Sequence, residues 1–338
     1  MKLQFNYSLK EINTFGIEST AEVYLNVKKV WNLIRPDYSI YHNQLILGGG
    51  SNIVLPERFD GIVFRVNITG AKIVKETANY RIVRVGAGAS WHKFVKSLIE
   101  AGVYGFENLA LIPGRVGAAP IQNIGAYGIE QEKYFYSAEI VDLAKRKRFF
   151  MDKDEFSFGY RNSFFKQEMK SGFVITHIHY KFPLKWEPNT EYKDIQNAIS
   201  NTENFELTPN NIFKLVCDIR SKKLPDPKET GNAGSFFKNP IVNQEFYQNL
   251  LLTYPDLTGY SDKDGMKISA AKLIEKAGWK GRKLNENSQA GISDKHSLVI
   301  INLGNATYHD IFELSEAVIN DIYDKYGIRL EREVNMIS

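Results

Sequence analysis

The chain has 338 residues, a length greater than one hydrophobic core usually covers, so two or three domains are expected. Of these residues, 43% are hydrophobic and 13% aromatic. Its formal net charge is only +4, with acidic and basic residues interspersed, and this argues against a nucleic-acid or membrane partner. A single cysteine, Cys217, excludes an internal disulfide framework and a cysteine-based zinc site.

The N-terminal segment MKLQFNYSLK lacks the apolar core of a signal peptide, and no segment approaches ~18 consecutive apolar residues. The six histidines show no metal-binding spacing, and we interpret His177 and His179 as one face of a strand. These features predict a soluble protein of the cytoplasm that holds no metal and has no obligate protein partner.

The first half of the chain predicts several strands and one helix. Short apolar segments separated by polar turns indicate strands of a small α/β unit at AEVYLNV (21–27), LILGG (45–49) and GIVFRV (61–66). Arg81–Val85 predicts a further strand, and apolar residues at helical spacing behind Ser90, the expected N-cap, predict a helix. Strand patterns return at SAEIVDL (137–143), KRFF (147–150) and GFVITHIHYKF (172–182).

The polar stretch 187–209 predicts a boundary or an excursion, after which Thr208 and Pro209 begin a helix. Its buried face is expected to carry Ile212, Leu215, Val216 and Ile219. Further along we expect a helix carrying Ile268, Leu273, Ile274 and Ala277, and then a strand at SLVIIN (297–302). A helix from about His309 to Tyr326 should end at Gly327, followed by a terminal strand, IRLEREVNMI (328–337).

Two glycine-rich segments carry the first functional signal. In LGGGSN (47–52), three glycines let backbone N–H groups face an anion, while Ser51 and Asn52 add donors, as in a diphosphate cradle. The segment does not match the G-x-G-x-x-G dinucleotide fingerprint. A tight turn is the competing interpretation.

PGRVGAAPIQNIGAYG (113–128) lies in a long stretch with neither helical nor strand periodicity, and such stretches are usually functional. Its small residues would let a planar ligand lie against the backbone, while Gln122 and Asn123 could bond to the edges of a ring. Close backbone packing is the alternative. Together the two segments suit a ligand that has both a diphosphate and a ring system.

Further motifs are each weak alone. They are FGYRNSFFK (158–166), KLPDP (223–227) with GNAGSFFKNP (231–240), and LEREV (330–334). With the two glycine-rich segments they form five motifs in the order and approximate spacing of the UDP-N-acetylenolpyruvoylglucosamine reductase family. From about Asn13 to the last strand, the chain resembles this family.

The resemblance implies an α+β protein with a vanillyl-alcohol-oxidase-type FAD-binding fold of two α/β subdomains and a third, α+β substrate domain. We expect residues 1–70 to form the first subdomain, 71–207 with strand 328–338 the second, and 208–327 the substrate domain. The implied activity is reduction of UDP-N-acetylglucosamine-enolpyruvate to UDP-N-acetylmuramate, with non-covalent FAD and with NADPH as reductant. This step belongs to peptidoglycan synthesis, on which cell shape and division depend.

Matching the motifs one by one, the resemblance implies that Arg161, Ser235 and Glu333 are catalytic, with Glu331 the less favoured of the two acids. The implied substrate contacts are Tyr192 (as in the longer-loop subclass), Lys223, Asn239 and His296, the last standing where some members have a glutamine. The expected FAD-binding residues are Gly48, Gly49, Gly50, Ser51, Asn52, Pro113, Gly114, Val116, Gly117, Ala118, Ala119, Gln122, Asn123, Gly125, Ala126 and Tyr127.

The chemistry fits these side chains. Hydride transfer to the enolpyruvyl methylene would push charge onto the adjacent carbon and carboxylate, and the Arg161 guanidinium can grip that carboxylate through two parallel hydrogen bonds. Ser235 can then protonate the carbanionic carbon, and Lys223 can help to balance charge. An ionised Glu333 would oppose the growing anion, so we expect it to be paired with Arg161 or kept protonated by burial.

Two other interpretations stay open. One is a different flavin oxidase or dehydrogenase of the same fold; such enzymes often attach the flavin covalently through His or Cys near the phosphate loop, which here reads LGGGSN. The other is a non-catalytic module that binds flavin or a UDP-sugar. The presence of Arg161, Ser235 and Glu333 argues against a lost active site.

Overall fold

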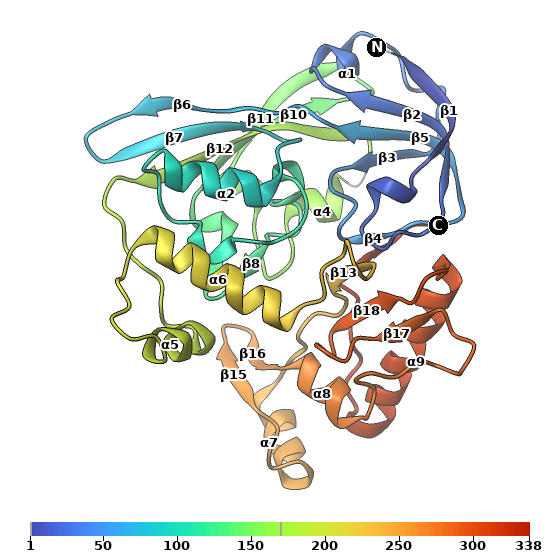
Figure 1. The fold of residues 1–338 in the computed structure, drawn as a ribbon. Coiled ribbons are helices and arrows are strands. Elements are labelled where there is room, and N and C mark those ends of the chain that lie inside the picture. Colours follow the sequence, from blue (N-terminus) through green and yellow to red (C-terminus); the bar gives the residue numbers. More distant parts are fainter. Residues whose placement is uncertain (1, 170) are drawn as a thin grey trace. The chain divides into compact units, whose positions relative to one another are not determined.

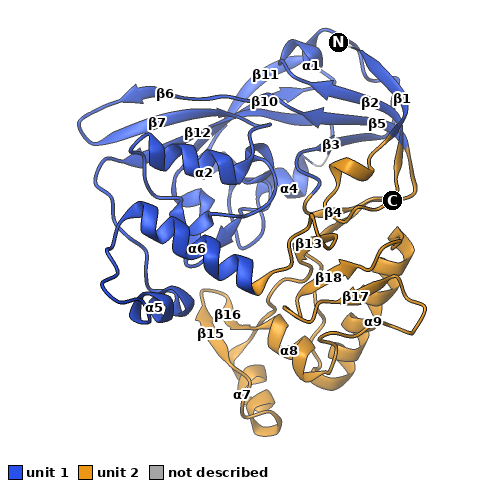
Figure 2. Ribbon diagram, viewed as in Figure 1, with its two compact units in different colours: residues 1–7, 21–50, 60–222 blue, residues 8–20, 51–59, 223–338 orange. Residues whose placement is uncertain are grey.

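The computed structural model describes residues 2–169 and 171–338 (Figure 1). Figure 2 colours its two compact units, each with its own buried apolar cluster. Unit 1 comprises residues 1–7, 21–50 and 60–222, and unit 2 comprises residues 8–20, 51–59 and 223–338. The three-domain division expected from the sequence differs from these units and stays a prediction.

A four-stranded sheet in the order β1-β2-β5-β3 lies almost entirely in unit 1. Its strands are β1 (Leu3–Ser8), β2 (Thr20–Val27), β3 (Gln44–Leu47) and β5 (Arg58–Val66). β3 runs parallel to β5, and side chains such as Leu25 and Phe64 are fully buried. The three strands predicted in this region are confirmed, and the end of β3 leads directly into the first glycine-rich segment.

An antiparallel five-stranded sheet, β11-β10-β12-β7-β6, forms the larger part of unit 1 (Figure 1). Its strands are β6 (Ala71–Glu76), β7 (Tyr80–Gly86), β10 (Phe135–Asp142), β11 (Lys147–Asp152) and β12 (Phe173–Pro183). The predicted helix is α2 (Trp91–Glu100), and the Trp91 and Phe94 rings lie 6.2 and 5.9 Å from the Tyr180 ring of β12. The helix therefore packs its apolar face on this sheet.

Ser90 stands at the N-cap of α2, as predicted, but within the described chain its side chain makes no capping hydrogen bond. The first N–H group of the helix, that of Trp91, instead donates to the carbonyl of Gly114 at 3.1 Å. The start of α2 is thus satisfied by the second glycine-rich segment, which ties that segment to the sheet.

His177 and His179 lie on one face of β12, as predicted, and both point to the buried Glu139 of β10. Their ring nitrogens lie 3.3 and 3.7 Å from its carboxylate, which also accepts from Arg84 Nη2 at 3.0 Å. Burial alone would raise the pKa of Glu139, but hydrogen bonds from His177 and Arg84 hold it well below its usual range. This cluster is a polar network within the sheet, built on the ion pair between Arg84 and Glu139. The described residues contain no group of three or more His, Cys, Asp or Glu side chains able to hold a metal.

Further helices and short elements complete unit 1. The helices are α1 (Trp31–Ile34), α3 (Lys153–Phe156), α4 (Phe164–Glu168), α5 (Lys193–Ser200) and α6 (Pro209–Lys223). A two-stranded ribbon consists of β8 (Gly125–Ala126) and β9 (Ile129–Glu130), and the 3-10 turns are η2 (Glu107–Leu109), η3 (Val116–Ala118) and η4 (Gln131–Lys133). α6 begins at Thr208–Pro209 as predicted, and its Ile212 and Val216 are buried with Ile195 of α5.

Unit 2 contains three small sheets. Their strands are β13 (Asn232–Ser235), β18 (Val299–Asn302) and β17 (Ala290–Ile292); β14 (Ile241–Val242), β16 (Gly265–Ile268) and β15 (Gly259–Asp262); and β4 (Ile53–Val54) with β19 (Asn335–Met336). The helices are η1 (Lys10–Ile12), α7 (Gln244–Thr253), α8 (Ala270–Lys276) and α9 (Tyr308–Tyr326). α9 ends at Gly327, whose φ of 67° is left-handed, as predicted.

Two expectations in unit 2 are wrong. Ile268 belongs to strand β16 rather than to the following helix, because Ser269 caps α8 through its Oγ, which accepts from Lys272 N at 3.4 Å. The terminal segment 328–337 is not one strand: it forms an isolated bridge at Arg332 and the short parallel strand β19. Its alternating apolar residues Ile328, Leu330 and Val334 are buried in the apolar cluster of unit 2, although the segment forms no continuous ladder of strand hydrogen bonds.

Among the described residues, no helix is both long enough and apolar enough to cross a membrane.

Candidate active site

The two glycine-rich segments meet in unit 1. A Cβ added to Gly49 would come within 2.5 Å of the Cα of Gly114, so only glycine allows this approach of one backbone to the other. A Cβ on Gly48 would lie 3.6 Å from the Cβ of Ala118. The structure thus brings together two segments that are separated by sixty residues of chain, as expected of a shared cradle.

Backbone hydrogen bonds fix the second segment against residues 87–91. Gly117 N donates to Ala87 O at 2.8 Å, and Val116 N donates to Ala89 O at 2.9 Å. With the bond from Trp91 N to Gly114 O, these contacts hold residues 114–117 in a defined conformation before any ligand arrives. A preformed backbone surface of this kind binds a ligand with little loss of conformational entropy.

Two partly or fully buried arginines lie beside this cradle, and we did not single them out from the sequence. Burial, and then the positive charge of Arg115, lower the pKa of Arg65 to about 10. Burial also lowers the pKa of Arg115, whose Nη1 donates to the carbonyl of Gly88. Desolvated cations that repel each other are stabilised by a bound anion. The residues present therefore fit the diphosphate of FAD.

The first segment ends in a different environment. Asn52 belongs to unit 2, where its side chain donates to the carbonyl of Glu333 at 3.2 Å. In return, the Asn335 side chain donates to the carbonyl of Asn52 at 2.9 Å. Asn52 therefore anchors the C-terminal segment that carries Glu333, and its predicted role as a donor to FAD stays a prediction, as does that of Ser51.

Asn123 organises the second segment from within. Its side chain is fully buried, donates to Glu130 at 3.0 Å and to Glu132 at 3.1 Å, and accepts from Gln131 at 3.3 Å. These bonds occupy the amide that we expected to meet the edge of a ring. A contribution of Asn123 to flavin binding would therefore come from its backbone.

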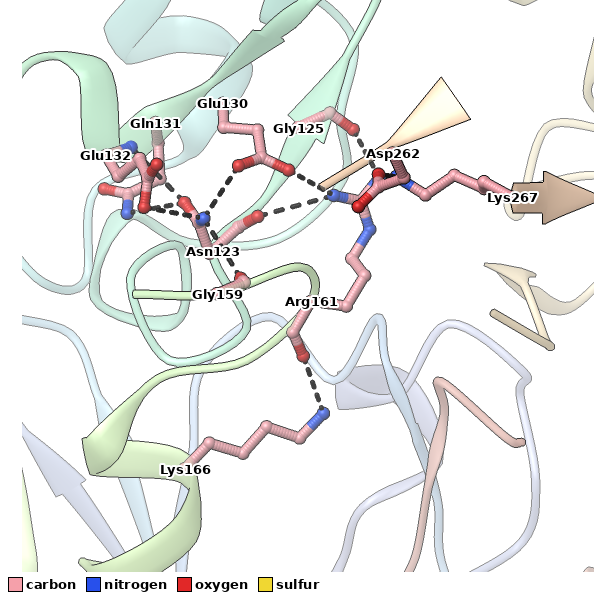
Figure 3. Close-up of polar contacts among 10 residues, drawn as sticks. All are labelled: Asn123, Gly125, Glu130, Gln131, Glu132, Gly159, Arg161, Lys166, Asp262 and Lys267. Atoms are coloured by element: carbon pink, nitrogen blue, oxygen red, sulfur yellow. Dashed lines mark hydrogen bonds and ion pairs between the residues drawn. The ribbon is translucent and has the colours of Figure 1, made fainter. Parts of the chain in front are cut away.

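Arg161 faces the same loop (Figure 3). Its guanidinium donates to the carbonyl of Gly125 at 2.7 Å, and Nη1 lies 3.7 Å from the carboxylate of Glu130. A Cβ on Gly125 would lie 3.1 Å from Nη1, so the glycine makes room for the arginine. The Arg161 carbonyl accepts from Lys166 Nζ at 3.3 Å. Glu130 was missed because nothing in its own sequence context marks it.

Several residues of this region adopt left-handed backbone conformations although they are not glycines. The φ angles of Leu111, Asn123, Tyr127 and Arg161 are 58°, 45°, 49° and 52°. Such conformations are disfavoured and persist only where the surrounding contacts enforce them, commonly at functional sites. Their concentration around the second glycine-rich segment supports a ligand site there.

Tyr192 lies at the N-terminus of α5, within the polar excursion 187–209. Its side chain is 45% exposed, and its ring meets that of Tyr127 edge-on at a centroid distance of 5.3 Å. The excursion is attached to the glycine-rich segment at its base, because Asn108 Nδ2 donates to both the Tyr127 and the Asn189 carbonyl, at 2.8 and 3.0 Å. A hydrogen bond from Arg220 of α6 also reaches Tyr127.

In unit 2, Ser235 and Glu333 are carried by neighbouring segments. Glu333 N donates to Phe236 O at 2.8 Å, and Lys238 N donates to Glu331 O at 2.9 Å. Phe236 is fully buried, which holds Ser235 exposed at the end of β13. Glu333 is partly buried, whereas the Glu331 side chain is 71% exposed and paired with Lys238. The choice of Glu333 over Glu331 as the catalytic acid stays a prediction.

The expected substrate contacts in unit 2 are also polar and preorganised. Burial, and then the charges of Lys223 and Lys280, lower the pKa of His296, which favours the neutral imidazole. Its Nδ1 accepts from Leu298 N at 3.2 Å, which leaves Nε2 as the donor. Asn239 Oδ1 accepts from Ala270 N at 3.0 Å, which directs the Nδ2 donor away from α8.

Comparison with known proteins identifies the family. Residues 226–337 match the UDP-N-acetylenolpyruvoylglucosamine reductase C-terminal domain, and residues 27–145 match an FAD binding domain. The chain is 41% identical over 334 residues to UDP-N-acetylenolpyruvoylglucosamine reductase of Burkholderia ambifaria strain MC40-6, covering 97% of this chain and 95% of that one. The chain belongs to this family. The reductase of Shewanella oneidensis strain MR-1 is likewise 41% identical, over 340 residues that cover 99% and 97% of the two chains.

The resemblance seen in the five motifs is therefore confirmed, and the chain is an FAD-containing oxidoreductase of this family. A solved structure of the reductase from Thermus caldophilus shares the fold, with a TM-score of 0.68 at 23% identity and coverage of 100% and 98% of the two chains. An FAD-binding fold followed by an additional C-terminal domain is confirmed as well.

Proposed function

We propose that this protein reduces the enolpyruvyl group of UDP-N-acetylenolpyruvoylglucosamine to give UDP-N-acetylmuramate for peptidoglycan synthesis, with NADPH as reductant. The contact between the two glycine-rich segments at Gly49 and Gly114 carries this proposal, since two such backbone segments side by side can cradle a diphosphate and admit a ring system. We place this reaction in the cytoplasm.

The cradle in unit 1 supplies the FAD site. The backbone N–H groups of Gly48–Gly50 and the cations Arg65 and Arg115 would hold the diphosphate, and the small residues of 113–128 would admit the ring system. Bound FAD supplies the hydride to the substrate. The protein's own task is to exclude water, orient the substrate and deal with charge and protons.

Arg161 is assigned to the substrate carboxylate. As negative charge grows on that carboxylate and the adjacent carbon, a fixed guanidinium lowers the energy of the transition state. Glu130 lies beside the guanidinium, 3.7 Å from Nη1. The bond to Gly125 O fixes the orientation of the guanidinium.

Ser235 is assigned to the proton. Its hydroxyl projects from the end of β13, held by the buried Phe236, and it would protonate the carbanionic carbon. Glu333 lies on the neighbouring segment, where its backbone N–H group donates to the carbonyl of Phe236. Its carboxylate would position and polarise the Ser235 hydroxyl. Lys223, the neutral His296 and Asn239 offer donors that suit the diphosphate and sugar of the substrate.

The function is tested by the colour of the purified protein. We expect it to be yellow and to release FAD on denaturation. Without oxygen, NADPH should bleach the bound flavin, and the enolpyruvyl sugar nucleotide should restore the colour. Flavin that stays attached to denatured protein would favour a covalent oxidase, and bleaching without recovery would contradict the substrate assignment.

We propose that Tyr192 closes over the bound sugar nucleotide as part of a lid, and Tyr192→Phe tests this. Tyr192 is half-exposed on a polar excursion, and mobile lids are commonly built from such segments. We expect substrate binding to weaken by about 3- to 10-fold, the usual loss for one hydrogen bond, with flavin reduction by NADPH unchanged. Tyr136→Phe, at a similarly exposed tyrosine of β10, is the matched control. Equal loss in both half-reactions would show that Tyr192 is not a lid.

A further inference from the structure

His92 holds the loop that leads into the second glycine-rich segment. Its Nδ1 accepts a hydrogen bond from the backbone N–H of Leu111 at 3.0 Å. Leu111 has a left-handed φ of 58°, a conformation that is disfavoured for any residue with a Cβ. An acceptor placed at its N–H group is one of the contacts that enforce this conformation two residues before Pro113.

The imidazole is itself fixed in place. It stacks on the Phe213 ring of α6 at a centroid distance of 5.3 Å and an interplanar angle of 12°. The preceding residue, Trp91, grips the same loop, because its Nε1 donates to Leu109 O at 2.9 Å. Two consecutive side chains from the first turn of α2 thus hold residues 109–111, and His92 is the one of the two that can take up a proton.

We propose that His92 is a positioning residue that sets the flavin-binding loop, and that its protonation releases Leu111 and weakens flavin binding. This inference rests on the proposed flavin site at residues 113–128. A neutral imidazole can accept at Nδ1, whereas in the imidazolium both nitrogens carry protons, so the bond from Leu111 N–H is lost.

The surroundings of the ring favour the neutral form. Burial, and then the positive charge of Lys96 one turn along α2, lower the pKa of His92. The other elements near the ring also carry charged or titratable groups. In the preceding and following loops, Glu107 accepts from Gly105 N and Arg115 donates to Gly88 O. On α6, Lys214 is exposed and Cys217 is half-buried beside Asp218 and Arg220. The hydrogen bond from Leu111 N–H to His92 is therefore present at neutral pH, and it is lost only below the ordinary pKa of an imidazole, near 6.5.

Two substitutions separate the acceptor from the charge. His92→Phe keeps an aromatic ring for Phe213 but removes the acceptor, while His92→Asn places Oδ1 close to the position of Nδ1 and cannot be protonated. The dissociation constant of FAD is measured for the wild type and both variants by flavin fluorescence between pH 5.5 and pH 8. His309→Asn, at an exposed histidine of α9, is the matched control.

At pH 8 we expect His92→Phe to bind FAD about 3- to 10-fold more weakly than the wild type, the loss typical of one hydrogen bond. His92→Asn should bind FAD within about twofold of the wild type, because its Oδ1 keeps the hydrogen bond from Leu111 N–H. As the pH falls to 5.5, the wild type and His309→Asn should weaken towards His92→Phe, while His92→Asn keeps its affinity.

The same pH dependence in the wild type and His92→Asn, with tight FAD binding in both, would overturn this proposal alone. That comparison decides the matter even when His92→Phe does not fold, because it uses only the conservative variant. Failure of the wild type to bind FAD at any pH would overturn the proposed function and this inference with it.

Discussion

Replacing Ser235 by alanine is expected to slow reoxidation of the reduced enzyme by the enolpyruvyl substrate by a factor on the order of 10²–10⁴, the usual effect of removing a positioned acid. FAD binding and reduction by NADPH should be unchanged, because the proton from Ser235 is needed only after the hydride has reached the substrate. Rapid mixing measures the two half-reactions separately. Ser235→Cys should recover part of the loss, since a thiol can also donate a proton.

A structural serine would behave differently. Thr307 is such a residue: it caps α9, and its Oγ1 accepts from Asp310 N at 3.2 Å. Thr307→Ala should lose about 1 kcal/mol of stability, as capping residues do, and keep both half-reactions. If Ser235→Ala followed that pattern and its reoxidation were unimpaired, Ser235 would have no part in the proton transfer.

The position of Ser235 shows what the sequence could and could not predict. Motif and spacing placed it in the site, but the reason for its exposure is tertiary. Phe236 and Phe237 are both buried, and backbone bonds join this segment to residues 331–333, far along the chain near its C-terminus. No local pattern could have predicted that pairing, so the terminal segment was expected to be a regular strand.

Periodicity predicted the elements well where one face is buried against a sheet or a helix. β2, β5, β12 and α9 were all predicted, because the alternation or helical spacing of their apolar residues reflects the core on one side. Ile268 was wrongly placed in a helix, since it lies next to the helical residues in sequence and is equally buried. Only the cap at Ser269 marks the change from strand to helix.

The polar contacts of the site were harder to predict than its glycines. A glycine-rich segment is visible in the sequence, and Gly49 and Gly114 do approach each other. Asn123 looked like a donor to a ligand, yet its amide is used by Glu130 and its neighbours. Arg115 did carry a signal that we did not use: it is the one charged side chain in PGRVGAAPIQNIGAYG.

Arg161→Met should leave the enzyme yellow and reducible by NADPH but slow the reduction of substrate by about 10²–10³, the range for losing a donor at a developing anion. Arg161→Lys should fall between the wild type and Arg161→Met. A lysine keeps the positive charge but cannot form the two parallel bonds of a guanidinium. If the bonds of Arg161 act mainly in the transition state, the turnover number falls more than the Michaelis constant rises.

The competing explanation is that Arg161 only supports the glycine-rich loop through its bond to Gly125 O. In that case Arg161→Met and Arg161→Lys would weaken FAD binding, and reoxidation measured with saturating flavin would be normal. Arg146→Met is a suitable control, because Arg146 also has a left-handed backbone, with φ of 54°, but lies exposed in a turn before β11. Both half-reactions should be unchanged in Arg146→Met. If the Arg161 variants then lose only the rate of reoxidation, the loss reports the contact with the substrate carboxylate. It does not come from removing an arginine from a disfavoured backbone conformation.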